Sequence, residues 1–212
     1  MLLAILIASG PLEAPQATQL KRETMLEYAR CLWSQSPRRV RELLVSEPGS
    51  DRQRELGRQV SGANLGCLKG RPVLSFSSAL LRGQLAEVGF AADVPLREAA
   101  ARLPAQEVAP PDPATIEKDV AEMSSADREY AFTEAFREAY GSCVARANPG
   151  AIAAMLATAP GSLAERAALI GVGAPLMACM PATMSYTIKA PELRPFLASA
   201  LYHAAATAPL GK

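Results

Sequence analysis

The sequence predicts an all-α protein built from two homologous four-helix repeats, and three observations lead to this prediction. Apolar side chains recur at steps of three or four over residues 20–34 and 126–147, which is the pattern of an amphipathic helix. No stretch shows the sustained alternation of apolar and polar residues, rich in β-branched side chains, that favours strands. The 212-residue chain also matches itself when it is shifted by 112 positions. Half of the residues are hydrophobic, which is enough for a sizeable core.

The internal match aligns residues 28–90 with residues 140–202. Fourteen of these sixty-three positions are identical without a gap, and the identities include cysteines, prolines and glycines, which have structural roles. Such self-similarity indicates an internal duplication. We expect the two copies to pack about a pseudo-two-fold axis, with each helix burying one apolar stripe.

Start signals for the second and third helices occur in both copies. Ser36 and Asn148 each precede a proline, and an N-cap residue followed by proline at the first helical position begins a helix. The third helix is expected to begin at a capping box and to run towards the second cysteine of each copy. The capping boxes are Ser50-x-x-Gln53 and Ser162-x-x-Glu165, and the fourth helices, at about 77–90 and 191–206, carry Leu-Arg-x-x-Leu-Ala.

The sequence between the copies differs from both of them. Five prolines interrupt residues 91–125, which predicts one short helix at about 95–103 followed by an extended linker. Residues 91–139 carry eleven acidic against five basic residues, whereas residues 21–90 carry twelve basic against seven acidic. The connector either lies across the basic first copy or forms a solvated loop. The predicted parts are a signal peptide with a short linker (1–19), repeat 1 (20–90), the acidic connector (91–125), repeat 2 (126–206) and a tail (207–212).

The N-terminus resembles a secretory leader. Residues 2–8 read LLAILIA, a length that fits the apolar region of a signal peptide and is too short to span a bilayer. No basic residue precedes this run, so the alternative is an ordinary N-terminal helix that packs on the core. No later segment reaches the roughly 20 apolar residues of a membrane helix.

Four cysteines allow three disulfide pairings. Cys31 and Cys67 are 36 positions apart, as are Cys143 and Cys179, and only the pairing within each copy treats the copies alike. Disulfides persist outside the reducing cytosol, which agrees with the leader-like N-terminus. The alternatives are buried free thiols, a zinc site and redox thiols. The last two usually show closely spaced cysteine pairs, which this chain lacks, and we predict no metal site.

Arg82 and Arg194 occupy matched positions near the start of each fourth helix. A guanidinium in this position could bind a carboxylate or phosphate of a small anionic ligand. The alternative is a structural arginine that caps or pairs with a neighbouring element.

No motif in the sequence names a reaction, and we predict no catalytic residue and no cofactor. The single histidine, His203, leaves triad chemistry dependent on one residue. Acidic residues alternate with arginines on one helix, as on a salt-bridged exposed face; they are Asp127, Glu129, Glu134 and Glu138. A formal net charge of +1 argues against nucleic-acid binding, which needs a basic face.

Trp33 has no counterpart in the second copy and is expected in the core or as an anchor for a partner.

The order Cys…Pro…Pro-Gly-Ser…Cys…Leu-Arg-x-x-Leu-Ala, after a leader-like start, resembles uncharacterised small exported proteins of alphaproteobacteria with a duplicated helical repeat. This resemblance covers most of residues 25–205. It implies export and duplication, and it carries no activity, ligand or partner with it.

These observations favour a non-enzymatic periplasmic or secreted protein with a binding or structural role and one disulfide in each repeat. Its partner would be a protein or a small anionic ligand, and the groove between the copies is the first place to look for a site. Two alternatives stay open. One is a cytoplasmic helical adaptor with reduced cysteines, and the other is an enzyme that uses carboxylates or arginines in the groove between the repeats.

Overall fold

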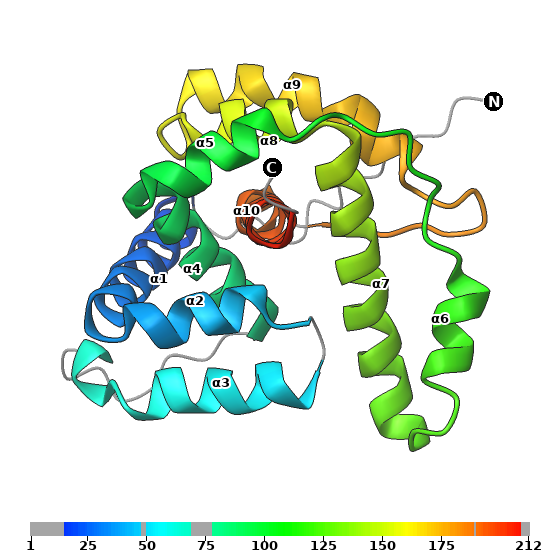
Figure 1. Ribbon diagram of the computed structural model, residues 1–212, viewed down its shortest axis with the longest axis horizontal. Coiled ribbons are helices and arrows are strands. Elements are labelled where there is room, and N and C mark those ends of the chain that lie inside the picture. Colours follow the sequence, from blue (N-terminus) through cyan, green and yellow to red (C-terminus); the bar gives the residue numbers. More distant parts are fainter. Residues whose placement is uncertain (1–14, 48–49, 69–77, 189, 209–212) are drawn as a thin grey trace.

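The computed structural model describes residues 15–47, 50–68, 78–188 and 190–208 (Figure 1). Within these ranges the regular structure is entirely helical, so the predicted all-α class is confirmed. Of the predicted signal peptide and linker (1–19), residues 1–14 lie outside these ranges. The helices are α1 (Pro15–Gln35), α2 (Pro37–Val45), α3 (Asp51–Gly62), the 3-10 helix η1 (Leu65–Leu68), α4 (Ser78–Ala92), α5 (Val94–Arg102), α6 (Pro113–Asp119), α7 (Ser125–Ala147), α8 (Pro149–Leu156), α9 (Leu163–Ala178) and α10 (Ala190–Thr207).

The second helices begin where proline predicts, but their caps differ. Oδ1 of Asn148 accepts a hydrogen bond from the Ala151 amide, which satisfies a free N–H at the start of α8. Ser36 makes no such bond at the start of α2, so its predicted role as a side-chain cap is wrong. Its hydroxyl pairs with the side-chain amide of Asn64, which ties the start of α2 to the segment after α3.

The third helices begin at the predicted serines. Ser50 accepts from the Gln53 amide and Ser162 from the Glu165 amide, each at 3.1 Å. Gly161 has a φ of +77°, a left-handed conformation that favours glycine at this point of the chain. The two helices differ in length, because α3 ends at Gly62 whereas α9 continues to Ala178. The second cysteine of the first half therefore lies in η1, beyond the helix that was expected to reach it.

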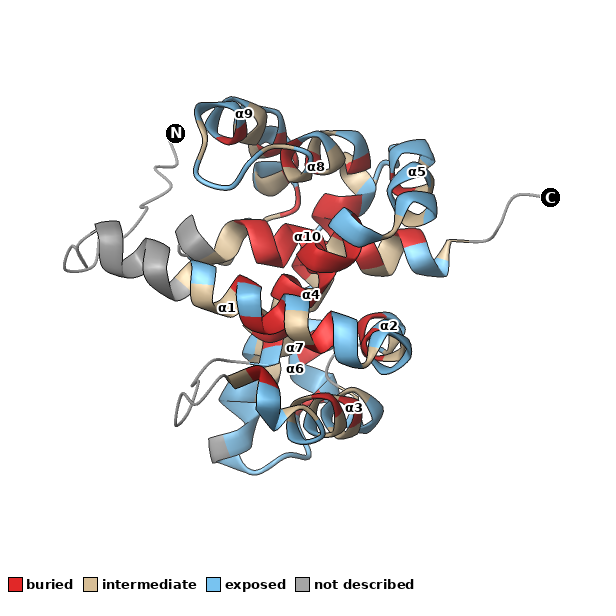
Figure 2. Cartoon of the chain, turned by 90° about the vertical axis from the view of Figure 1, so that its left-hand side faces the viewer, coloured by how far each residue is buried: buried red, intermediate tan, exposed pale blue. Residues whose placement is uncertain are grey.

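Helices α4 and α10 form the centre of the molecule. Figure 2 shows buried residues concentrated on these two helices, with the other helices arranged around them. Between positions 81 and 90 every residue of α4 is buried, including Arg82, Gln84 and Glu87. A Cβ added to Gly83 would lie 2.6 Å from Cβ of Pro195, so the two backbones approach closely there. This crossing depends on a residue without a side chain.

The connector forms more structure than predicted. Helix α5 matches the expected short helix, but the segment after it also contains α6, which the prolines were expected to prevent. Asp112 caps α6 and Pro113 begins it, because proline is well tolerated at a first helical position. Helix α6 lies along α7 in Figure 1, and the Gln106 amide donates to the Arg146 carbonyl. The connector thus packs largely on the second half of the chain rather than across the basic first half.

Near the N-terminus, helix α1 begins at Pro15, within the segment predicted to be a linker.

Candidate functional site: a cleft beside a buried ion-pair cluster

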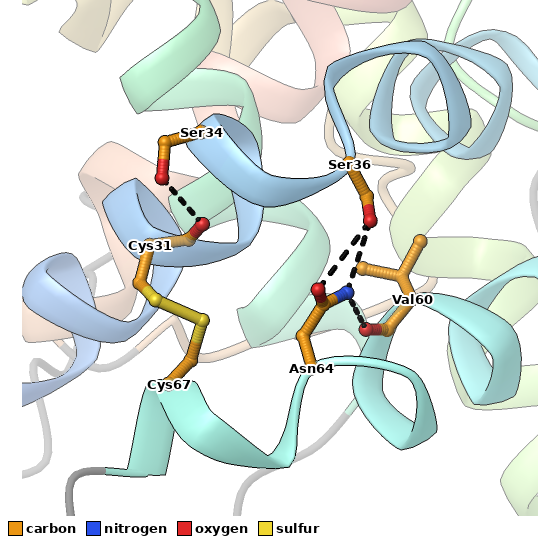
Figure 3. The surroundings of a disulfide bond; sticks show 6 residues. All are labelled: Cys31, Ser34, Ser36, Val60, Asn64 and Cys67. Carbon is orange, nitrogen blue, oxygen red and sulfur yellow. Dashed lines mark hydrogen bonds between the residues drawn. A yellow bond between two sulfur atoms is a disulfide. The ribbon is translucent and has the colours of Figure 1, made fainter.

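The structure contains both of the disulfides that the cysteine spacing predicts. Cys31 is joined to Cys67 and Cys143 to Cys179, with Cα–Cα distances of 5.6 and 5.8 Å. Figure 3 shows that the first bridge fastens α1 to η1, beside the contact between Ser36 and Asn64. The second fastens α7 to the end of α9. Two disulfides are consistent with an oxidising, extracytoplasmic compartment.

The matched arginines bind the ends of matched helices. Nη2 of Arg82 donates to the carbonyls of Leu44 and Ser46, at 2.9 and 3.0 Å. Nη2 of Arg194 donates to the carbonyls of Leu156 and Thr158, at 2.8 and 3.0 Å. Each of these acceptors lies 112 positions from its counterpart. The carbonyls at a helix C-terminus lack partners within the helix and attract positive charge, so both arginines act as caps.

Arg194 also joins two buried carboxylates. Its Nε donates to Oε1 of Glu87 at 2.6 Å, and its Nη1 donates to Oε1 of Glu165 at 2.9 Å. All three residues are at most 8% exposed. Oε2 of Glu165 accepts from the Gly161 amide at 2.5 Å, and Arg22 lies 3.7 Å from Glu165. Within the described part of the chain, Oε2 of Glu87 has no hydrogen-bond partner and almost no solvent contact.

Arg82 has a poorer environment than Arg194. Its Nε and Nη1 are buried and have no hydrogen-bond partner among the described residues. Burial lowers the pKa of Arg82, and the nearby Glu138 carboxylate opposes this effect. Burial raises the pKa of Glu138, and the positive charge of Arg82 opposes that change. Glu138 is partly buried and therefore departs from the exposed, salt-bridged face predicted for this helix, whereas Asp127 and Glu129 are exposed as predicted.

A cleft of about 980 Å³ opens between the two halves of the chain. Helices α1 and α4 supply one side, α5 and α8 supply the others, and Arg194 enters from α10. The lining is mainly alanine and larger apolar side chains, and its charged residues are Arg30, Glu87, Arg97 and Arg194. Arg30 and Arg97 are exposed, whereas Glu87 and Arg194 are buried. This volume and composition are typical of a site for a small molecule.

The structure separates the two arginines that were considered for ligand binding. Arg194 lines the cleft, but its three guanidinium nitrogens are already hydrogen-bonded. Arg82 does not line the cleft. The residue that sequence reasoning missed is Glu87, whose signal was that it is the single acidic residue of the mainly apolar helix α4. Glu165 was recognised only as part of a capping box.

The remaining candidates have structural environments. Trp33 is buried and packs close to Gly89, with the guanidinium of Arg41 over its ring at 5.2 Å. His203 is half-buried, and burial and the charge of Arg82 lower its pKa. Asp127 accepts from the Ser124 hydroxyl at the start of α7.

Among the described helices, none has the length and apolar character needed to cross a bilayer. In comparisons with protein families, curated proteins and solved structures, the chain gives no match.

Proposed function

We propose that the chain is an exported binding protein of duplicated origin that holds a small ligand in the cleft between its halves. The observation that carries this proposal is the cleft itself. Its walls come from helices far apart in the sequence, and it has the volume and apolar lining of a ligand site. The proposed export also agrees with the resemblance to exported proteins of alphaproteobacteria.

Contacts between matched residues support the duplication and the pseudo-two-fold arrangement. Gly83 packs against Pro195, and the rings of Phe90 and Tyr202 lie 5.8 Å apart. In each pair the partners are 112 positions apart. An axis of two-fold symmetry brings equivalent residues together in this way. The two contacts are seven residues apart in the same direction along α4 and α10, the two helices that cross at the centre of the molecule.

The disulfides and the apolar run at 2–8 support export to the periplasm or secretion. Each bridge closes a loop within one repeat, and such bridges last only where the surroundings are oxidising. Cell fractionation with N-terminal sequencing and non-reducing peptide mapping tests this part. A cytoplasmic protein with four alkylatable thiols would overturn it and would favour the adaptor alternative.

A fluorescent apolar probe tests binding in the cleft. We expect N-phenyl-1-naphthylamine to become brighter with the wild-type protein, and Ala154→Trp to abolish the effect because Ala154 lines the cleft and is exposed. The matched control is Ala174→Trp, which adds the same ring to an exposed position of α9 outside the cleft lining. Equal probe binding by both variants would overturn the assignment of the site.

A further inference from the structure

We infer that the ligand of this cleft is an apolar molecule that carries a hydrogen-bond donor, and specifically an ammonium group, which it places against Glu87. The inference rests on the proposed function, and it adds the chemical class of the ligand.

Glu87 is more than nine-tenths buried, yet only one of its carboxylate oxygens is used. Oε1 accepts from Nε of Arg194, and Oε2 has no partner among the described residues. A buried carboxylate oxygen without a donor is unfavourable, since it has lost its hydration and gained nothing in exchange. Glu87 lines the cleft, and Oε2 has almost no solvent contact, so a donor in the cleft supplies the missing bond once side chains around Glu87 shift to admit it.

The cap on α8 does not require this carboxylate. Ser199 occupies the position that matches Glu87, and Gln53 the position that matches Glu165. Arg82 nevertheless binds its two carbonyls in the same way as Arg194 does. Among the described residues, a carboxylate hydrogen-bonded to the capping arginine is therefore found at only one of the two matched caps, and this is the cap beside the cleft.

In the buried cluster Arg22 and Arg194 balance Glu87 and Glu165, so the preference for a cation comes from the unpaired Oε2 of Glu87 and not from net charge. Arg194 cannot receive an anionic ligand group without losing bonds, because its nitrogens already bind two carboxylates and three carbonyls. Arg30 and Arg97 add positive charge to the lining, but both are exposed, where water and salt weaken their effect on a buried group. The apolar body of the ligand would lie against the alanines of α5 and α8.

A series of naphthalene compounds with one shape and three head groups tests this inference. The compounds are 1-naphthylmethylamine, 1-naphthylmethanol and 1-naphthoate, and each competes with N-phenyl-1-naphthylamine for the wild-type protein. We expect the ammonium compound to bind most tightly and the carboxylate least tightly, with about a tenfold or larger difference between them. A ranking led by the carboxylate, or equal affinities, would overturn the inference.

The Glu87→Gln variant provides a second test of the same inference. The glutamine oxygen can still accept from Nε of Arg194, while an NH₂ group replaces Oε2 and turns an acceptor into a donor. We expect the preference for the ammonium compound to fall about tenfold. An unchanged preference in a folded Glu87→Gln protein would overturn the inference. Displacement of the probe by no compound, with no effect of Ala154→Trp, would instead overturn the proposed function. The wild-type ranking tests the ligand class even if the variant does not fold.

Discussion

Nε of Arg194 lies 2.6 Å from Oε1 of Glu87, a contact between α10 and α4 that spans 107 positions of sequence. The same guanidinium caps α8 and binds Glu165 at the start of α9. One side chain therefore connects four helices at the inner end of the cleft. Removing the arginine would leave the buried Glu87 carboxylate without a donor, would take one donor from the buried Glu165, and would free several carbonyls at the end of α8.

Replacing Arg194 is expected to destabilise the fold more than replacing its counterpart. We predict that Arg194→Met lowers the free energy of unfolding by about 3–5 kcal/mol, the cost of leaving a buried charge without its partner. Arg82→Met should cost less, because Nε and Nη1 of Arg82 have no hydrogen-bond partner in the described structure and methionine relieves their burial. Urea unfolding of both variants measures the difference. Equal losses would contradict a special role for the Arg194 cluster.

The contrast between these two arginines also marks what the sequence could predict. The shift of 112 positions pairs Arg82 with Arg194 and Cys31–Cys67 with Cys143–Cys179, as expected if the two halves arose by a duplication that kept residue type and spacing. It cannot pair Arg194 with Glu87, since that contact depends on how α4 and α10 cross. Local signals located most helix starts, and they failed at α6, where proline began a helix that it was expected to break.

The two disulfides are predicted to contribute similarly to stability. Each closes a loop of 36 positions, and loop closure of this length stabilises by about 4 kcal/mol on the chain-entropy model. We expect Cys31→Ala with Cys67→Ala, and Cys143→Ala with Cys179→Ala, to lower the free energy of unfolding by comparable amounts. Urea unfolding under non-reducing conditions measures both. A loss confined to one pair would show that strain or residual structure outweighs chain entropy.

The close approach of α4 to α10 predicts opposite effects for two glycine substitutions. Gly83→Ala should lower the free energy of unfolding by about 1–3 kcal/mol, because the new methyl group meets Pro195. Gly57→Ala is the matched control within a helix, since a Cβ there meets nothing within 4 Å. It should raise stability by about 0.5–1 kcal/mol through helix propensity alone. Thermal unfolding of the two variants checks the signs, and a neutral Gly83→Ala would contradict the close crossing.

The sequence directed the search to a groove between the copies, but the residues that form the cleft could not be predicted, for a physical reason. Its walls come from α5 of the connector and from α8, and the sequence placed the connector either across the first copy or in solvent. The packing of α5 on α8 and α10 depends on small side chains such as Ala100 and Ala153, which carry no local signal of their partner. Burial of Glu87 follows from the same packing.

His203 provides a pH-dependent test, because it is the only histidine in the sequence. Burial and the charge of Arg82 lower its pKa from the ordinary value of about 6.5, against the opposing effects of the Leu44 carbonyl and Glu47. A proton therefore binds the unfolded chain more readily than the folded one. The contribution of His203 to stability is complete above about pH 6.5 and is lost as the pH falls towards the lowered pKa of the folded state.

We expect His203→Gln to remove this part of the pH dependence, since glutamine keeps a polar side chain that does not titrate. The measurement is the free energy of unfolding of both proteins between pH 5 and pH 8, taken as a difference at each pH so that the carboxylates common to both cancel. Wild type should lose stability relative to His203→Gln as the pH falls below about 6.5. A difference that stays constant across this range, or one that grows in favour of wild type at low pH, would contradict the lowered pKa and with it the burial of His203 beside Arg82.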